Sequence, residues 1–425
     1  MPEHAPKGFA APAALQDTGW LRRPETERVF AALSAPGVET RAVGGAVRNA
    51  LLGKPVKDVD LATTALPEQV MALARKAGLK AVPTGIEHGT VTVIADGLPY
   101  EVTTLRHDVE TFGRHATVAF TENWEEDARR RDFTLNALYA GSDGALFDPL
   151  GGYADLVAGR VRFIGDAEER IKEDYLRILR FFRLHAYYGK GPLDPEGLHA
   201  AVRLRAGLDQ LSAERVSAEL RRLLVAPRAV EGVEALFDYG LLPGVLGTAP
   251  RLERFKRLVA IETALGRSAE ATVRLAALAI FVVEDAERLA ARLRLSKVEQ
   301  AVLTLGAADH AETGLPDEAA AKRALYQLGP SDFVASMLIA WADSGASTED
   351  EAWRQVLSLP ERWQAPSFPL RGADLVALGD LQGPEIGIFL RRLEADWVAG
   401  GFALSREDLL ARADALIRKS PRQNG

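Results

Sequence analysis

The chain has 425 residues with 52 basic and 59 acidic side chains, which gives a formal net charge of −7. Its 47% hydrophobic and 26% charged residues exclude a globally disordered or fibrous protein, and about 100–200 residues per domain predicts two to four domains. The lack of cysteine favours a reducing, cytoplasmic location. The lack of a long apolar run, and of a signal-like segment in residues 1–17, argues against a membrane or secreted protein.

Short β-like runs alternate with helical ones in the first part of the chain. The expected elements are a strand over 40–43, a helix over 46–52, a strand over 56–62, a helix over 67–77, and strands over 90–95 and 100–105. The last two strands flank Asp96 and Gly97, a pair typical of a two-residue hairpin turn. This order predicts a small mixed sheet backed by helices.

Residues 106–126 form a polar stretch without a sustained period, which predicts a long functional loop. Short strands follow at 146–149 and 161–164. Beyond residue 167 the pattern is helical, with helices expected over 173–187, 213–224, 229–237, 251–265, 269–282, 285–292 and 297–305. The sequence therefore predicts an α/β head with a small mixed sheet and helices over 20–150 and an extended all-α region, divided into a neck over 151–228 and a body and tail over 229–425.

The glycine pair Gly44 and Gly45 lies between the first strand and the first helix. Glycine allows a positive φ and close approach of a ligand to the backbone, and the free N–H groups of a helix start favour an anion such as a triphosphate. Arg48 follows within reach of the same phosphates. Taken alone, this pattern is also consistent with an ordinary turn.

Asp58 and Asp60 are two residues apart in a β-rich run, so both carboxylates are expected on one face of a strand. A divalent cation relieves their repulsion, and magnesium prefers one or two carboxylates together with substrate phosphates. Two such ions activate an attacking hydroxyl and stabilise a leaving pyrophosphate. A solvated pair at a strand end is the alternative. A third acid is expected from Glu101 on a neighbouring strand, or from its rival Asp132.

Residues 129–137 combine a basic cluster with polar groups that suit a nucleotide. Arg131 offers donors for phosphate, and Asp132 and Asn136 offer acceptors for ribose hydroxyls. A solvated basic helix start is the alternative interpretation of this segment.

Residues 173–183 contain a second polar and basic pattern. Asp174 and Arg177 are i, i+3 neighbours on the expected helix, so their carboxylate and guanidinium can present an acceptor and donors to the edge of a base. Arg180 stays near this face of the helix, whereas Arg183 turns away unless the helix bends. An ordinary salt-bridged helix is the alternative.

In this order the three blocks resemble the class II, bacterial-type family of tRNA nucleotidyltransferases and poly(A) polymerases. The matching segments are 44–48, 58–60, 130–134, 136–137, 148–149 with 151, 155–156, 164–166, and 173–174 with 177. The resemblance implies a template-independent enzyme that adds C, C and A to tRNA 3′ ends from CTP and ATP.

The resemblance also implies a role for each matched residue. Asp58 and Asp60 would bind Mg²⁺, Gly45 and Arg48 would hold the triphosphate, and Arg131 and Asp132 would hold the phosphate and ribose. Asp174 and Arg177 would select cytosine or adenine, and Arg180 and Arg183 would support the nucleotide pocket. Gly44 and Asn136 are further nucleotide-binding candidates.

Two positions depart from the family pattern, which usually has aspartate where Asn49 stands and proline where Tyr175 stands. The segment 84–93 and the loop over 106–126 resemble those of full CCA-adding enzymes, which favours CCA addition over poly(A) synthesis. A degenerate head retained as an RNA-binding module is the non-enzymatic alternative.

The helical region is expected to hold tRNA by shape and phosphate contact, since A-form helices are recognised mostly in this way. A net charge of −7 gives no overall attraction to nucleic acid, so local basic groups must supply it. The candidates are Arg221, Arg222, Arg254, Lys256 and Arg257. Neither a membrane nor DNA is expected as a partner.

Overall fold

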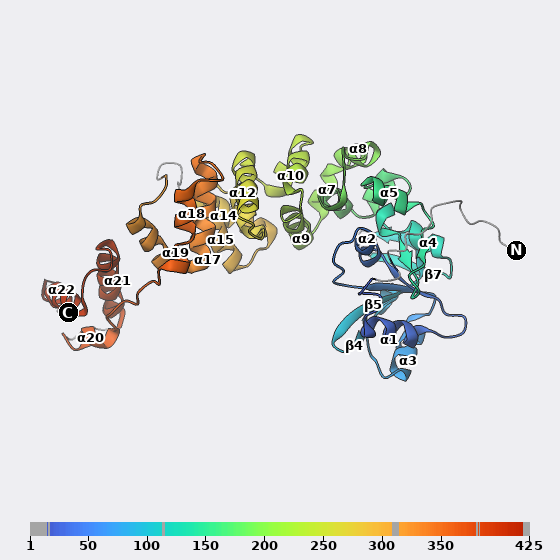
Figure 1. The fold of residues 1–425 in the computed structure, drawn as a ribbon, viewed down its shortest axis with the longest axis horizontal. Coiled ribbons are helices and arrows are strands. Elements are labelled where there is room, and N and C mark those ends of the chain that lie inside the picture. The colour runs from blue at the N-terminus through green and yellow to red at the C-terminus, as the bar shows by residue number, and fades with distance from the viewer. Residues whose placement is uncertain are drawn as a thin grey trace. The chain divides into compact units, whose positions relative to one another are not determined.

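The computed structural model describes residues 15, 18–112, 115–307, 314–379, 381 and 383–419, without the side chains of 108–112, 115–118 and 419 (Figure 1). Most of the segment 1–17, for which no signal peptide is expected, lies outside the described residues. The chain forms two compact units, Met1–Val245 and Leu246–Gly425. No helix in the described ranges combines the length and the apolar character needed to cross a bilayer.

The described part of the first unit contains a seven-stranded mixed sheet (Figure 1). Across the sheet the strands are β3 (Lys80–Gly85), β4 (Thr90–Ala95), β5 (Leu98–Thr104), β2 (Asp60–Thr63), β1 (Thr40–Val43), β8 (Tyr139–Ala140) and β9 (Leu146–Phe147). β2 pairs in parallel with β5, and all other neighbours are antiparallel. α1 (Pro24–Leu33) and α3 (Pro67–Lys76) pack against β4. The predicted mixed sheet with helices is confirmed.

The hairpin between β4 and β5 forms at the predicted turn. Asp96 and Gly97 have φ of 48° and 85°, the left-handed conformations that a type I′ turn requires at both central positions. The side chains of β4 alternate between half-buried and buried, as expected for a strand with one covered face. β3 was not predicted, because Pro83 weakens its strand pattern. Its position at the sheet edge tolerates a proline.

The segment expected as a loop over 106–126 contains regular structure instead. β6 (Arg106–Phe112) and β7 (His115–Phe120) pair as a separate antiparallel sheet, and α4 (Trp124–Arg129) follows them. The loop prediction is wrong because the two strands pair with each other, so neither needs a continuous apolar face. The strand expected over 161–164 is reduced to a single bridge between Phe133 and Phe163.

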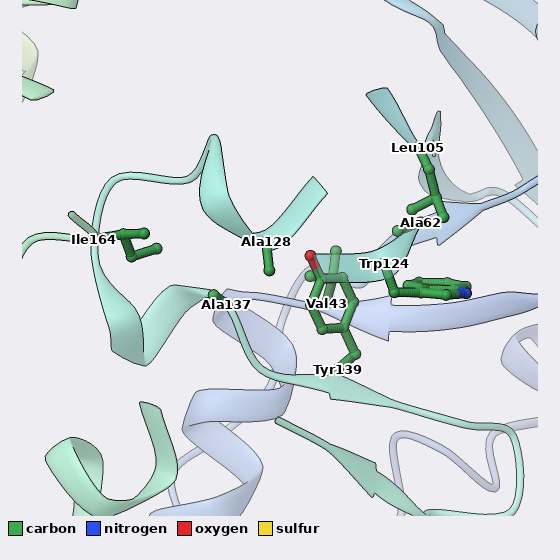
Figure 2. Close-up of a cluster of buried hydrophobic side chains, with 8 residues drawn as sticks. All are labelled: Val43, Ala62, Leu105, Trp124, Ala128, Ala137, Tyr139 and Ile164. Atoms are coloured by element: carbon green, nitrogen blue, oxygen red, sulfur yellow. The ribbon is translucent and has the colours of Figure 1, made fainter. Parts of the chain in front are cut away.

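A cluster of buried side chains joins α4 to the central strands (Figure 2). Trp124 and Ala128 of α4 pack with Val43 of β1 and Ala62 of β2. The ring of Trp124 meets the ring of Tyr139 edge to face, with centroids 5.3 Å apart. The cluster therefore fixes α4, and the residues directly after it, near the end of β1.

The first unit contains further helices, two of which interrupt the strand order: α2 (Gly45–Leu51) between β1 and β2, and the short 3₁₀ turn η3 (Thr134–Asn136) before β8. The others follow the last strand: α5 (Gly152–Ala158), α6 (Ala167–Glu173), α7 (Leu176–Tyr188), α8 (Pro195–Arg203), α9 (Ala213–Leu224) and α10 (Ala229–Asp238). α7 packs against α9 and α10. The helix predicted over 173–187 is interrupted, because Asp174 is extended (φ −157°, ψ 104°) and its carboxylate accepts the N–H of Leu176.

The second unit is helical throughout its described residues. Its helices include α12 (Leu252–Ala264), α13 (Ala271–Ala279), α14 (Val283–Leu293), α15 (Lys297–Thr304), α17 (Glu318–Ser344), α18 (Glu351–Leu357), α19 (Leu359–Arg362), α20 (Gly372–Val376), α21 (Gly383–Ala399) and α22 (Arg406–Lys419). α17 bends at Gly329 (φ 75°, ψ 170°), directly before Pro330. A second hydrophobic cluster, which includes Leu393 and Trp397, packs α20, α21 and α22 together. The predicted all-α region is confirmed.

Candidate active site

The glycine turn between β1 and α2 has the conformation that only glycine adopts freely. Gly44 has φ 70° and ψ −119° and precedes α2 as its N-cap. A β-carbon on Gly44 would lie 3.6 Å from the main-chain oxygen of Asn136 and 4.0 Å from Nη1 of Arg131. The turn therefore brings the start of α2 next to the side chain of Arg131, so that the backbone N–H groups of the helix start lie close to a guanidinium.

Arg48 is buried on α2, and its hydrogen-bond partners among the described residues are neutral. Its Nη1 donates to the side-chain oxygen of Asn136, and its Nη2 donates to the hydroxyl of Tyr188 at 2.8 Å. The guanidinium also lies over the Tyr188 ring, 4.1 Å from its centroid, and weakly contacts Oδ1 of Asn49. Burial lowers the pKa of Arg48. A buried cation without a carboxylate partner is an attractive position for an anionic ligand.

The acidic residues gather at the ends of two neighbouring strands. Asp60 is the first residue of β2 and is the register partner of Glu101 on β5, while Asp58 lies just before the strand and not on it. All three side chains are exposed. Although Asp60 is accessible, the surrounding protein partly shields it from water and raises its pKa; the charges of Glu101 and Asp58 raise this pKa further, and Arg131 lowers it. Carboxylates that repel in this way suit a divalent cation.

Asp58 and Asp60 fit a magnesium ion by the chemistry of their donors. Their carboxylates make no hydrogen bond or ion pair with the described residues, so the oxygens are available. In the described ranges no three His, Asp or Glu side chains form a ready-made metal cage. Magnesium commonly takes one or two carboxylates and completes its shell with water and substrate phosphates, which is compatible with this open arrangement.

Arg131 is held in place by a carboxylate that sequence reasoning missed. Asp127 of α4 is fully buried and accepts hydrogen bonds from Arg130 at 2.8 Å, from Arg131 at 3.0 Å and from the hydroxyl of Tyr139 at 2.8 Å. Burial alone would raise the pKa of Asp127, but Arg131, Arg130 and Tyr139 lower it to about 2. In the sequence Asp127 looks like one more acid in the first turn of a helix, beside Glu125 and Glu126.

Asp132 links the head to helix α7. Its Oδ1 accepts from the side-chain nitrogen of Asn136 at 2.9 Å, and its Oδ2 accepts from Nε of Arg180 at 2.8 Å. Burial would raise the pKa of Asp132, but Arg180 and Asn136 lower it to about 2. Since Asn136 also accepts from Arg48, an unbroken polar chain runs from α2 through η3 to α7. The structure thus brings together Arg48, Asn136, Asp132 and Arg180.

Arg180 and Arg183 remain on one side of α7 because they share a carboxylate. Glu219 of α9 is buried, pairs with Nε of Arg183 at 2.5 Å, and lies 3.6 Å from Nη1 of Arg180. Glu219 was also missed by sequence reasoning. Its signal is its position on the apolar face of α9, one turn before the buried Leu223, where a charge needs a partner.

The main-chain N–H of Arg177 donates to the main-chain oxygen of Asp174 at 3.0 Å, but in the described part of the chain their side chains pair with other groups. The Oδ2 of Asp174 pairs with Nη2 of Arg215 on α9 at 2.6 Å, and Nη1 of Arg177 pairs with Glu173 and with the main-chain oxygen of Arg170. Both side chains are largely buried. The neighbouring carboxylate and guanidinium therefore lie at the break between α6 and α7, each with its own partner.

Not every basic candidate for RNA contact is available. Arg254 is buried in the second unit and donates to the main-chain oxygens of Ala277 at 2.7 Å, Gly306 at 3.0 Å and Ala276 at 2.8 Å. Burial lowers the pKa of Arg254 to about 10. The prediction that Arg254 contacts RNA is wrong, because its guanidinium satisfies the backbone of the helical core.

The sheet, the acidic strand ends and the glycine turn define the head of a nucleotidyltransferase. Consistent with this class, the family model of the "Poly A polymerase head domain" matches residues 40–162, and the model of the "Probable RNA and SrmB-binding site of polymerase A" matches residues 192–255.

Similarity to individual proteins defines the family more narrowly. "CCA tRNA nucleotidyltransferase 1, mitochondrial" of Mus musculus is 36% identical over 88% of this chain and 86% of its own length, and a "CCA-adding enzyme" of Limosilactobacillus fermentum is 30% identical over 92% and 96%. The crystal structure of the Bacillus stearothermophilus CCA-adding enzyme in complex with CTP matches with a TM-score of 0.70 and 28% identity, over 93% of this chain and 98% of that one. The chain belongs to the family of CCA-adding tRNA nucleotidyltransferases.

Proposed function

We propose that this protein adds C, C and A to the 3′ end of tRNA from CTP and ATP without a template, and releases pyrophosphate at each step. One arrangement carries the proposal: the acidic strand ends lie in the same unit as a glycine turn lined by arginines, and a polar chain ties that turn to α7. Acids suit the reacting 3′ hydroxyl, and arginines suit the triphosphate.

Asp58 and Asp60 would hold Mg²⁺, and Glu101 would be the third acidic group. Magnesium bound there supplies a positive charge that favours ionisation of the hydroxyl and stabilises the leaving pyrophosphate. In each cycle the 3′ oxygen of tRNA forms a bond to the α-phosphorus, the bond from that phosphorus to the bridging oxygen breaks, and the hydroxyl proton passes to a carboxylate. Glu101 suits this proton because its side chain is exposed next to Asp60.

The nucleotide would lie between the glycine turn and α7. Gly44 and Gly45 would let the triphosphate approach the backbone, with Arg48 and Arg131 balancing its charge. The ribose would lie against Asn136 and Asp132. Arg180 and Arg183 would line the pocket from α7. Asp132 pairs with Arg180, and Glu219 pairs with both arginines.

Base selection would come from Asp174 and Arg177. The carboxylate accepts from the exocyclic amino group of cytosine or adenine, and the guanidinium donates to a ring nitrogen or carbonyl. Guanine and uracil would leave donors or acceptors unmatched in a partly buried place, which costs affinity. Both side chains would exchange part of their present bonds to Arg215 and Glu173 for bonds to the base.

We also propose a division of labour along the chain. Residues 20–150 would carry the chemistry as a head, 151–228 would select the nucleotide as a neck, and 229–425 would hold tRNA as a body and tail. Arg221, Arg222, Lys256 and Arg257 are the remaining basic candidates for tRNA contact. The absence of cysteine supports a cytoplasmic site of action.

The test is incubation of a tRNA that lacks its CCA end with Mg²⁺ and each nucleotide separately or together, followed by measurement of product length. CTP alone should add two residues, and CTP with ATP should add three and then stop. Long tails from ATP alone would instead identify a poly(A) polymerase. The absence of any product with every nucleotide would contradict the proposed enzyme.

A further inference from the structure

Tyr188, the last residue of α7, contacts Arg48, which forms no ion pair with the residues that the structure describes. Its hydroxyl accepts from Nη2 of Arg48 at 2.8 Å, and its ring lies 4.1 Å from the centre of the guanidinium. Arg48 belongs to the head and Tyr188 to the far end of a neck helix, 140 residues later in the chain. This contact uses Nη2 of Arg48, whereas Nη1 of the same guanidinium begins the polar chain through Asn136, Asp132 and Arg180.

The direction of each hydrogen bond around Tyr188 follows from its neighbours. The amide nitrogen of Asn49 donates to the main-chain oxygen of Pro55 at 3.3 Å, so its Oδ1 faces Tyr188 and Arg48. A carboxamide oxygen only accepts, hence the Tyr188 hydroxyl donates to it at 3.1 Å and keeps its lone pairs for Arg48. Asn49 therefore fixes the direction of the Tyr188 hydroxyl, and this hydroxyl in turn orients the guanidinium of Arg48.

The surroundings leave the charge of Arg48 uncompensated. Among the described residues, neither Arg48 nor Lys54 forms an ion pair, and Nζ of Lys54 lies 4.7 Å from the centroid of the same tyrosine ring. Lys54 donates to the main-chain oxygen of Tyr187 at 3.0 Å, which ties the loop after α2 to the same helix end. Burial lowers the pKa of both cations. A buried and a partly buried positive charge around one neutral ring attract an anion.

We propose that Tyr188 is a positioning residue that holds the guanidinium of Arg48 in the orientation that binds the triphosphate of the incoming nucleotide. This inference rests on the proposed function and adds a residue that the sequence motifs do not contain. Since Tyr188 acts on phosphates and not on the base, it should affect CTP and ATP equally. Because it touches no reacting atom, it should change nucleotide affinity more than the rate at saturation.

The experiment compares Tyr188→Phe with Tyr187→Phe. The first removes the hydroxyl that orients Arg48 and keeps the ring; the second removes a neighbouring hydroxyl that donates to the main-chain oxygen of Arg222 at 3.2 Å. Tyr188→Phe should raise KM for CTP and for ATP about tenfold each, with kcat within about twofold, as expected for a lost hydrogen bond to a charged group. Tyr187→Phe should leave both constants unchanged.

A double-mutant cycle separates positioning from a general structural effect. In an Arg48→Lys background, Tyr188→Phe should have little further effect on KM, because the group it orients is gone. Equal losses in both backgrounds would overturn the proposal, as would a KM that rises for only one of the two nucleotides. A fall in kcat at unchanged KM would also overturn it.

Binding of inorganic tripolyphosphate distinguishes this inference from the proposed function. Tripolyphosphate carries the phosphates without base or ribose, and Tyr188→Phe should weaken its binding, measured by calorimetry, by a similar factor of about ten. If the wild-type protein binds tripolyphosphate and this variant binds it less well, the inference stands even where no nucleotide is transferred. Unchanged tripolyphosphate binding in Tyr188→Phe, or none in the wild-type protein, contradicts it.

Discussion

Asp60 and Glu101 are register partners in the parallel pairing of β2 with β5. Parallel neighbours lie about 4.8 Å apart and direct their side chains to the same face of a sheet, so the two carboxylates are held together by the backbone. Asp132 is less available to a metal ion or a proton, because its two oxygens already accept hydrogen bonds from Arg180, Asn136 and the N–H of Phe133. This difference favours Glu101 over Asp132 as the third acidic group.

Glu101→Gln should change both the rate and its pH dependence. Loss of the carboxylate removes the group that accepts the hydroxyl proton, so kcat should fall about a hundredfold or more, within the range usual for general bases. The pKa of Asp60 is raised in part by the charge of Glu101. Removal of that charge lowers it, so the acid limb of the residual activity should move to lower pH. The pH–rate profile of CMP addition measures both effects.

The matched control is Glu87→Gln, which removes an exposed carboxylate on the short turn before β4. It should leave the rate and the acid limb where they are. An acid limb at the same pH in Glu101→Gln and in the wild-type protein would mean that Glu101 does not interact with the ionisation that limits activity.

Asp58→Ala should abolish nucleotide addition and leave tRNA binding largely intact. Asp58 is exposed and precedes β2, so its removal leaves the sheet and its buried cluster unchanged. Product length on gels and tRNA retention on filters measure the two properties separately. Turnover at the wild-type rate would refute the metal-binding role of this carboxylate, and loss of tRNA binding would point to a structural defect.

Local rules predicted the parts of the fold that depend on neighbours in sequence. The turn at Asp96 and Gly97 needs only two residues with positive φ, and β4 needs only its own alternating pattern. The pairing of β2 with β5 is different, because it passes over β3 and β4 and no local pattern specifies it. Glu101 could therefore be selected as a candidate from sequence, but its register opposite Asp60 could not.

Two of the missed site residues, Asp127 and Glu219, share one physical property: each is a buried carboxylate that holds groups important to the site. Asp127 joins Arg131 to Tyr139, and Glu219 joins Arg180 to Arg183. In sequence such acids are indistinguishable from solvated ones until their burial is known. Conversely, the basic residues they hold were recognised because arginines near glycine and aspartate motifs already suggest phosphate.

Asp127→Asn should destabilise the first unit in a pH-dependent way. The pKa of Asp127 is about 2 in the folded protein and about 4 in an unfolded chain, so its ionisation stabilises the fold above pH 4. That contribution, about 2.5 kcal/mol, is lost as pH falls from about 4 to 2. The variant should therefore unfold at lower urea concentration than wild type at pH 7, and the difference should shrink towards pH 2.5. A constant difference would contradict the assignment.

Arg254→Met should lower the stability of the second unit without a direct effect on catalysis. The guanidinium satisfies several main-chain oxygens, so its removal leaves buried acceptors unsatisfied. The substitution also takes an arginine partner from Asp343, which Arg251 still contacts at 2.8 Å. The expected loss is about 3–5 kcal/mol in the free energy of unfolding, since each unsatisfied buried acceptor costs about 1–3 kcal/mol. Arg288→Ala, which removes a side chain that is 73% exposed, should change it by less than about 0.5 kcal/mol. Equal unfolding curves for the two variants would contradict the structural role of Arg254.

Asp174→Ala and Arg177→Ala should relax the choice of base more than they weaken binding of tRNA. Each removes one half of the acceptor and donor set at the break before α7. CTP and ATP then lose a matched bond that UTP and GTP never made, so the difference between the nucleotides becomes smaller. The ratio of kcat/KM for CTP over UTP should fall about tenfold or more, since one good base contact is worth about 1–3 kcal/mol. Arg203→Ala, on the exposed pair of α8 with Glu168, is the control and should keep the ratio. If both variants keep the wild-type ratio, the base is selected elsewhere in the pocket.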